Sequence, residues 1–569
     1  MFTRTPLARA LACALLLTPA LPAAADPAEL VELKTTIVKL IDALVEQGVL
    51  DADKAAALVA EAEASGKAAA QVEAADDAQV AATAPGAAGE GTEDAVPNDV
   101  VRVTYVPDIV KEEIRNEVRA ELRREVTEDV VAVAKAERWG TKDALPDWVS
   151  RLTWSGEFRL RSQSDFFASG NAATLFDFNA INDAGGVAAA GPDVFLNTRE
   201  DEHILRARMR LALEAKVNDT VTVATRLSTG EVDNPVSANT TFRNNNPPFE
   251  TFFDRAWLRY EPRSRDGMKW LTLRAGRLDN PWLSTNSEIT WDRDFKFDGV
   301  AGTLRYGFRD DGLSYRDPNE RYLFLTAGVF PIDEIELSSA DKWLLGAQAG
   351  GLWTFDNQSS IALAAAWYDY THIRGRRNQP GSDFHDFTAP DYMQRGNTLF
   401  DIADPADPAK NLLALAADYD ILHVNFLADW AILAPIHIGL EGDVVRNFGY
   451  DEQDVLARAG SPLALTSGES DARVMGYALG LNLGWPEINK FGDWFLHWHY
   501  TYLQRDAVLD AFTGSNPNRG GTNHRGWVIA AQYGLGTNTW LQARWFSVDE
   551  IDGPPLGTDR LQVDLNARF

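Results

Sequence analysis

Apolar and charged side chains alternate with a period of two along most of the chain after residue 146. In residues 204–216, leucine, alanine and methionine occupy one face, while Arg206, Arg208 and Arg210 occupy the other. A period of two is typical of a β-strand, whose successive side chains point to opposite faces. One face is too apolar to lie against water and the other is too charged for a packed core. The pattern therefore favours a strand with lipid outside and water inside.

The same alternation recurs throughout the C-terminal part of the chain. An even number of strands lets both ends of a barrel emerge on the same side of a membrane. The sequence therefore predicts an all-β transmembrane barrel of about 16 antiparallel strands over residues 146–569. The expected strands are 152–163, 204–216, 220–228, 252–262, 269–277, 297–307, 321–330, 342–355, 360–372, 418–432, 436–447, 473–485, 494–505, 524–535, 538–549 and 560–569.

Connection lengths agree with this count, because outer-membrane barrels alternate short periplasmic turns with long outer loops. Long connections follow the first, third, fifth, ninth, eleventh and thirteenth expected strands, and the stretch 308–320 is the main exception. Tryptophans near the expected turns suggest an aromatic girdle. The short connections are Asn218-Asp219, Asp356-Asn357, Ala434-Pro435 and Gly536-Thr537, and the tryptophans are Trp270, Trp353, Trp430, Trp485, Trp494 and Trp540.

The chain before the barrel has a different pattern. Residues 1–25 are typical of a secretory signal, with Arg4 and Arg9 ahead of an apolar run and small residues at its end. Residues 26–64 have apolar positions at helical spacing and predict a helical hairpin. Residues 65–100 have almost no large apolar side chain and predict a flexible linker.

The segment 101–145 contains the most regular helical pattern. Between residues 108 and 138 an apolar residue recurs every four positions, so the apolar stripe drifts around the helix and departs from a heptad repeat. We expect a periplasmic helix that joins copies of the chain in a coiled-coil arrangement. A helix that packs against the base of its own barrel explains the pattern about equally well.

Composition narrows the chemistry further. The one cysteine, Cys13, lies in the predicted signal, so the mature chain is expected to form no disulfide and no thiolate metal site. The net charge of −29 argues against a nucleic-acid partner, because surfaces that bind phosphate backbones are normally basic. The ordinary explanation for the acidic charge is the solubility of loops and of the N-terminal region.

Motifs around the fifth connection carry a family resemblance. The runs Gly276-Arg277-Leu278-Asp279-Asn280-Pro281, Trp291-Asp292-Arg293-Asp294 and Asp298-Gly299 resemble a family of outer-membrane porins of Gram-negative bacteria, which is similar to the trimeric porins. The resemblance covers the signal, the helical prefix and the barrel. It implies a homotrimer, and a third outer loop from Leu278 to Phe295 that folds inward and narrows the lumen.

The last residues also resemble a known signal. Leu561, Val563, Leu565 and Ala567 alternate up to the terminal Phe569, as in the C-terminal signal that the barrel assembly machinery recognises. In physical terms this is an amphipathic last strand, which could pair with the first strand and close the edge of the sheet.

Charged side chains predict a selective constriction. Opposed strips of charge set a transverse field that orients polar solutes and filters ions. The alternative is that the arginines pair with neighbouring carboxylates and fill a polar wall, and both can hold. The expected constriction carboxylates are Asp279, Glu288, Asp292, Asp294 and Asp298, and the expected lumen-facing cationic wall is Arg159, Arg161, Arg206, Arg208, Arg210, Arg226, Arg255, Arg259 and Arg274.

These patterns predict an outer-membrane porin through which small polar or charged solutes diffuse, with outer-membrane lipid and the barrel assembly machinery as partners. A barrel that acts as an adhesin or an enzyme is the alternative, since long loops such as 373–417 suit adhesion. Lys296 breaks the calcium-loop pattern, and His497 with His499 could supply only half of a metal site. We therefore expect no cofactor, no metal and no enzymatic activity.

Overall fold

The computed structural model describes residues 149–243, 245–308, 319–336, 338–459 and 471–569. The predicted signal, helical hairpin, linker and long helix lie outside the described residues, as does most of the connection 308–320.

Sixteen long antiparallel strands close into one barrel in the described part of the chain, which confirms the predicted fold class. Each long strand pairs with its neighbours in chain order, and β1 pairs with β19 to complete the ring. The strands are β1 (Leu152–Phe167), β2 (Glu202–Lys216), β3 (Val221–Thr229), β5 (Thr251–Tyr260), β6 (Leu271–Leu278), β7 (Phe297–Gly307), β8 (Arg321–Asp333), β9 (Lys342–Thr354), β10 (Ser360–Thr371), β13 (Asp420–Leu433), β14 (Ile436–Asn447), β15 (Met475–Gly484), β16 (Trp494–Leu503), β17 (His524–Gly536), β18 (Thr539–Glu550) and β19 (Gly557–Arg568).

The two faces of each strand differ as the alternation predicts. On β2, Leu205 and Met209 are each 52% exposed on the outer face, while Arg210 on the inner face is 7% exposed. On β1, Phe158 is exposed and Arg161 is buried. The apolar side chains on the outside of the barrel therefore form the surface that faces lipid, and the charged side chains line the interior.

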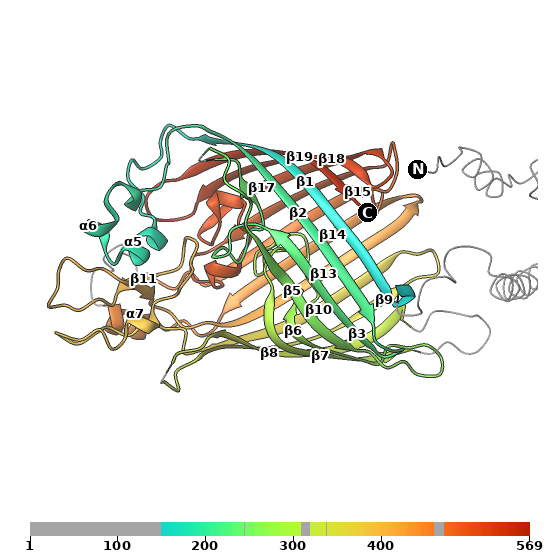
Figure 1. Cartoon of the computed structure of the whole chain (residues 1–569), viewed down its shortest axis with the longest axis horizontal. Helices are drawn as coiled ribbons and strands as arrows, with labels where there is room; N and C mark the ends of the chain where they lie inside the picture. The colour runs from blue at the N-terminus through green and yellow to red at the C-terminus, as the bar shows by residue number, and fades with distance from the viewer. Residues whose placement is uncertain (1–148, 244, 309–318, 337, 460–470) are drawn as a thin grey trace, which may run out of the picture. The chain divides into compact units, whose positions relative to one another are not determined.

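Short turns and long loops gather at opposite ends of the barrel. The connections 434–435 and 537–538 are tight turns, whereas α5 (Phe178–Ala184) and α7 (Glu452–Ala459) lie in loops at the other end (Figure 1). Of the predicted girdle, Trp270 is 44% exposed beside its turn. Trp540 differs, because it lines an internal cavity.

The long loops contain further small elements and most of the buried apolar core. Asp177 caps α5 by accepting a hydrogen bond from the N–H of Ala180, and Gly185 ends the helix with φ of 78°. Leu399, Phe400 and Leu413 are buried in the loop between β10 and β13. The remaining elements are η1 (Val149–Arg151), α6 (Val187–Ala190), η2 (Gly191–Val194), β4 (Thr240–Thr241), η3 (Asp386–Thr388), β11 (Leu399–Asp401), β12 (Leu413–Leu415), η4 (Asp510–Phe512) and η5 (Pro517–Arg519).

The last residue extends the pairing that closes the barrel. Phe569 and Gly156 exchange two backbone hydrogen bonds of 3.0 Å, one residue beyond the end of β19. The ring of Phe569 lies against Gly156, where a Cβ atom would come within 2.4 Å of it. Phe569 therefore lies on the outer face at the seam between β1 and β19, in the position that an amphipathic closing strand requires.

Candidate functional site

Residues 279–296, which join β6 to β7 and are called loop 3 below, contact distant parts of the barrel wall. At the tip of the loop, Thr285 and Ser287 donate hydrogen bonds to Asp443 of β14, the latter over 2.7 Å. Near its end, Asp294 contacts arginines of β2. In the order of pairing, β14 is seven strands from β2 in one direction and nine in the other. Loop 3 therefore crosses the interior between nearly opposite walls.

A third attachment holds the middle of loop 3. The backbone N–H of Leu283 donates to Oε1 of Gln348 on β9 over 2.7 Å, and Nε2 of Gln348 donates back to the Leu283 carbonyl over 3.0 Å. Asn425 of β13 donates to the same carbonyl. Near the tip, Asn286 donates to Glu441 of β14 over 2.8 Å. None of these wall residues was predicted as part of the site, and the signal for them in the sequence is polar side chains at inward positions of β9, β13 and β14.

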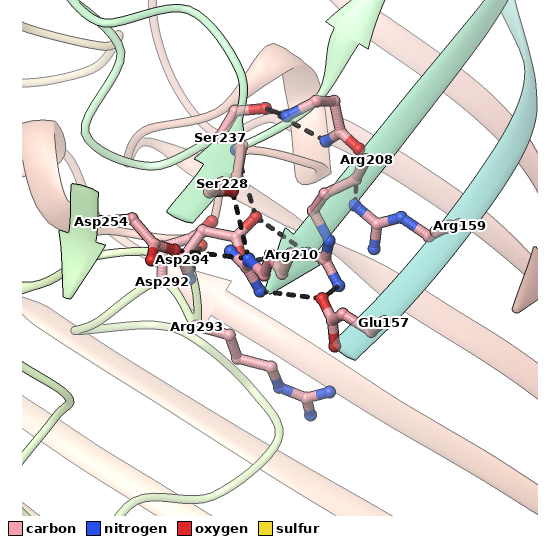
Figure 2. A network of polar contacts seen from close by, with 12 residues as sticks. Glu157, Arg159, Arg208, Arg210, Ser228, Ser237, Asp254, Asp292, Arg293 and Asp294 are labelled. Carbon is pink, nitrogen blue, oxygen red and sulfur yellow. Dashed lines mark hydrogen bonds and ion pairs between the residues drawn. The ribbon is translucent and has the colours of Figure 1, made fainter. Parts of the chain in front are cut away.

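Asp294 is the loop carboxylate most closely joined to the arginine wall. Arg210 donates to its Oδ1 over 2.8 Å and Arg208 over 3.1 Å, while both arginines also bind Glu157 of β1, at 3.2 and 2.7 Å (Figure 2). Burial alone would raise the pKa of Asp294, but Arg210 and Arg208 outweigh it and hold that pKa well below its ordinary value. Asp294 is therefore ionised at neutral pH.

Asp292 has a different environment although it is two positions away. Its carboxylate accepts the backbone N–H of Asp294 over 2.7 Å and that of Ser515 over 2.9 Å. It is 4% exposed and binds no arginine of the predicted wall. Burial, together with the nearby Glu288 and Asp294 carboxylates, raises the pKa of Asp292 well above its ordinary value. Asp292 therefore joins loop 3 to residues 504–523, which are called loop 7 below.

The other three predicted constriction carboxylates lie in separate places. Asp279 accepts from Arg255 of β5 over 2.6 Å and from Lys296 over 3.3 Å. Glu288 pairs with Arg293 of the same loop over 3.0 Å. Of the five carboxylates, only Asp279 and Asp294 contact the predicted arginine wall.

Asp298 does not join the cluster. It lies on β7 opposite Arg277 of β6 and pairs with it over 2.6 Å. The neighbouring cross-strand pair, Leu278 and Phe297, is fully buried in the apolar core. Because side chains alternate along a strand, Arg277 and Asp298 lie on the opposite face of the ladder.

A β-bulge adds a carboxylate that strict alternation of side chains does not predict. The register between β3 and β5 shifts between Arg226 and Leu227, so that Asp254 is an extra residue on β5. Asp254 is buried and binds Arg226 through two hydrogen bonds of 2.8 and 2.7 Å. It also lies 3.3 Å from Arg210. Strict alternation would point Asp254 away from Arg255, whereas both residues bind charged partners within this network.

The rest of the predicted arginine wall is only partly neutralised. Arg161 binds Asp564 of β19 through two hydrogen bonds of 2.7 and 2.8 Å, and Arg259 lies 3.1 Å from Glu214. Arg159 donates to the amide oxygen of Asn239 over 2.5 Å and has no carboxylate partner among the described residues. Within the same part of the chain, Arg206 and Arg274 also have no carboxylate within ion-pair distance.

A cavity of about 250 Å³ lies where loop 3, loop 7 and the wall meet. Its lining includes inward side chains of β1, β2 and β18 and carries six arginines and four carboxylic acids. No group of three or more metal-ligating side chains occurs in the described residues, and His497 and His499 are joined by a hydrogen bond of 2.8 Å. The cavity residues are Glu157, Phe158, Arg159, Arg161, Arg208, Arg210, Asn239, Glu288, Asp292, Arg293, Asp294, Ser515, Asn516, Trp540, Gln542, Arg544, Asn566 and Ala567.

Comparisons with known proteins identify the family. The family model described as Putative porin matches residues 34–569. Among solved structures, OprB of Pseudomonas putida is 9% identical, with 76% of this chain and 97% of that chain covered and a TM-score of 0.41. The outer membrane channel DcaP of Acinetobacter baumannii is 11% identical, with 74% and 98% covered and a TM-score of 0.36. No curated protein matches the sequence. Since the family match extends over almost the whole chain and the strands close into a 16-strand barrel, the chain belongs to the Putative porin family of outer-membrane β-barrel channels.

Proposed function

We propose that loop 3 narrows the lumen of this porin and that small polar or charged solutes diffuse passively past it. The observation that carries the proposal is the attachment of one loop to nearly opposite walls, at Asp443 of β14 and at Arg208 and Arg210 of β2. A loop held in this way occupies part of the cross-section, and charged side chains on its two sides set the field that a solute meets.

The charges at this position suit polar solutes better than apolar ones. The cavity beside loop 3 is bounded by guanidinium and carboxylate groups, so an apolar solute would have to displace the water that these groups bind. A polar solute can replace those hydrogen bonds with its own. A solute that passes without binding tightly needs several positions that each bind it weakly, and a wall of many charged groups provides them.

Bilayer recording of the purified full-length chain tests both parts of the proposal. The unchanged chain should give stable stepwise conductance. In T285V/S287A the tip of loop 3 loses both hydroxyl groups that donate to Asp443, so the single-channel conductance and its noise should rise. Ser382→Ala, which removes a hydroxyl group from a partly exposed serine in the loop between β10 and β13, is the matched control.

The outcomes separate the pore from its constriction. Folded barrel without conductance would contradict the channel function itself. Conductance that is the same in T285V/S287A and in the unchanged chain would retain the channel but remove loop 3 as its narrowest element. Migration of unheated and heated samples in detergent gels shows whether each variant has folded.

A further inference from the structure

Arginines face each other directly across neighbouring strands at four places on the inner wall. Like charges at opposite positions of an antiparallel ladder destabilise it, so such pairs need compensating negative charge. The four cross-strand pairs are Arg161 with Arg206, Arg159 with Arg208, Arg226 with Arg255, and Arg259 with Arg274.

Carboxylates of the chain compensate this charge only in part. The nine arginines of the wall have six carboxylates within ion-pair distance, three fewer than the arginines, and two of these six are shared with Lys296 and Arg544. The six carboxylates are Glu157, Glu214, Asp254, Asp279, Asp294 and Asp564.

The excess is spread over the wall. In three of the four pairs one arginine binds a carboxylate while the other, Arg206, Arg159 or Arg274, binds none in the described part of the chain. The Nε atoms of Arg159 and Arg206 are buried and have no hydrogen-bond partner. A buried donor without a partner costs free energy that a bound acceptor would recover.

The pairs follow one another from the loop end to the turn end of the barrel. Measured along β2, the four pairs lie at the positions of Arg206, Arg208, Ala212 and Lys216. Ala212 pairs directly with Arg226. Lys216 pairs with Thr222 of β3, which in turn pairs with Arg259 of β5. Ten residues of strand separate the first level from the last, which is roughly 33 Å at the rise of a β-strand. The apolar band of such barrels is about 25 Å tall. Because the strands of such barrels are tilted by roughly 35–45°, this length along the strand corresponds to a smaller height, and the arginine pairs are spread from the loop end toward the turn end.

Guanidinium chemistry indicates what the pairs would attract. Arginine carries several N–H donors in a planar fork that matches the two oxygens of a carboxylate, and it has no acceptor for a cation. A second arginine across the ladder doubles the donors and repels cations. A partly compensated pair can hold an anion weakly and release it to the next pair, which is the requirement for conduction.

We infer that the four cross-strand arginine pairs, which we call the arginine ladder, form successive binding positions for small carboxylate anions and make this channel anion-selective. The inference rests on the proposed channel function and adds the solute class. An entering carboxylate first meets Arg161 and Arg206 near the loop end, then passes Arg159 and Arg208 beside loop 3. It leaves past Arg259 and Arg274 at the turn end.

Reversal potentials in a bilayer with a KCl gradient test the selectivity. The unchanged chain should favour chloride over potassium. In R159Q/R206Q/R274Q the arginines without carboxylates lose their charge, so the chloride-to-potassium permeability ratio should fall several-fold. Arg243→Gln removes the same charge from an ion pair at the loop end, where Arg243 is 59% exposed, and should leave the ratio unchanged.

Succinate tests binding of carboxylates. Millimolar succinate should reduce the chloride current of the unchanged chain, whereas succinamide, which has the same shape without charge, should not. R159Q/R206Q/R274Q should need a several-fold higher succinate concentration for the same effect.

A conducting channel that prefers potassium, or a chloride current that succinate does not reduce, would overturn the ladder and leave the channel function intact. Absence of conductance from folded protein would instead overturn the proposed function. A second set of single variants, R159Q, R206Q and R274Q, provides the same comparison if the triple variant fails to fold.

Discussion

Asp292 and Asp294 lie two positions apart in loop 3, and their carboxylates experience opposite environments. Asp294 lies between Arg208 and Arg210, which hold its pKa well below the ordinary value against the effect of burial. Asp292 lies among backbone N–H groups and other carboxylates, and burial raises its pKa well above the ordinary value. Sequence position alone made them equivalent members of the predicted constriction.

Asp294→Asn and Asp292→Asn should therefore differ in their effect on ion selectivity. Asp294→Asn removes a full negative charge beside the arginine ladder, so the chloride-to-potassium permeability ratio at neutral pH should rise roughly two-fold, as expected for one charge at a constriction. Asp292 is bound by backbone N–H groups of loop 3 and loop 7 and contacts no arginine of the wall, so Asp292→Asn should shift the ratio less. Reversal potentials measure both. Equal shifts, or no shift in Asp294→Asn, would contradict this assignment of the two charges.

At the scale of elements, β6 and β7 determine where loop 3 begins and ends. Gly276 and Gly299 pair with each other across these strands with φ values of 118° and 145°, which residues with a Cβ rarely adopt. A Cβ at Gly276 would come within 2.2 Å of the Ala256 carbonyl oxygen, and one at Gly299 within 2.3 Å of the Val329 carbonyl oxygen. Both clashes are with backbone atoms, which cannot move without disturbing the neighbouring strands.

Gly276→Ala and Gly299→Ala should each lower the yield of folded barrel. Strained backbone of this kind costs about 1–3 kcal/mol per residue, and the contacts with backbone oxygens add to it. Gly302→Ala is the matched control, because its Cβ would meet only the flexible end of Leu273 at 2.9 Å and its φ is ordinary. The folded fraction on gels of unheated samples and the temperature at which it is lost measure the effect. A loss in Gly302→Ala as large as in the other two variants would contradict it.

The β-bulge on β5 is a second feature of a single strand that determines which charged groups meet. It places Asp254 against Arg226 and Arg210, and the adjacent Arg255 against Asp279. Two consecutive residues thus take part in one charged network, which lets a single strand supply both signs of charge. Period-two alternation excludes this arrangement in a regular strand.

At the scale of the whole molecule, the barrel closes between β1 and β19, where Phe569 pairs with Gly156. Before β1, the apolar stripe of residues 108–138 predicts a helix that joins copies of the chain.

Removal of residues 108–138 should therefore weaken oligomers without abolishing the barrel. Chemical crosslinking of the full-length chain in detergent should give trimers, and the shortened chain should give mainly monomers that still conduct in bilayers. A chain that lacks an equal length of the predicted linker, residues 65–95, should still give trimers. Trimers from the chain without 108–138 would instead favour the alternative, in which the helix packs against its own barrel.

The number of strands, their outer and inner faces and the alternation of turns and loops follow from the sequence pattern alone. These features depend on local patterns, because a period of two and the turn residues can be read within one segment. The inward positions of Arg159, Arg206 and Arg274 followed from the same alternation. The strand ends differ by a few residues, as for β1, which continues to Phe167 beyond the predicted 163.

Which charges meet depends on how the strands and loops pack against one another. Register between strands placed Arg159 opposite Arg208, the bulge brought Asp254 inward, and the crossing of loop 3 brought Asp294 to β2. Asp298, which a sequence pattern grouped with the loop, lies on the other face of β7. These outcomes depend on contacts between residues far apart in the chain, and a shift of one residue in register would exchange the inner and outer faces.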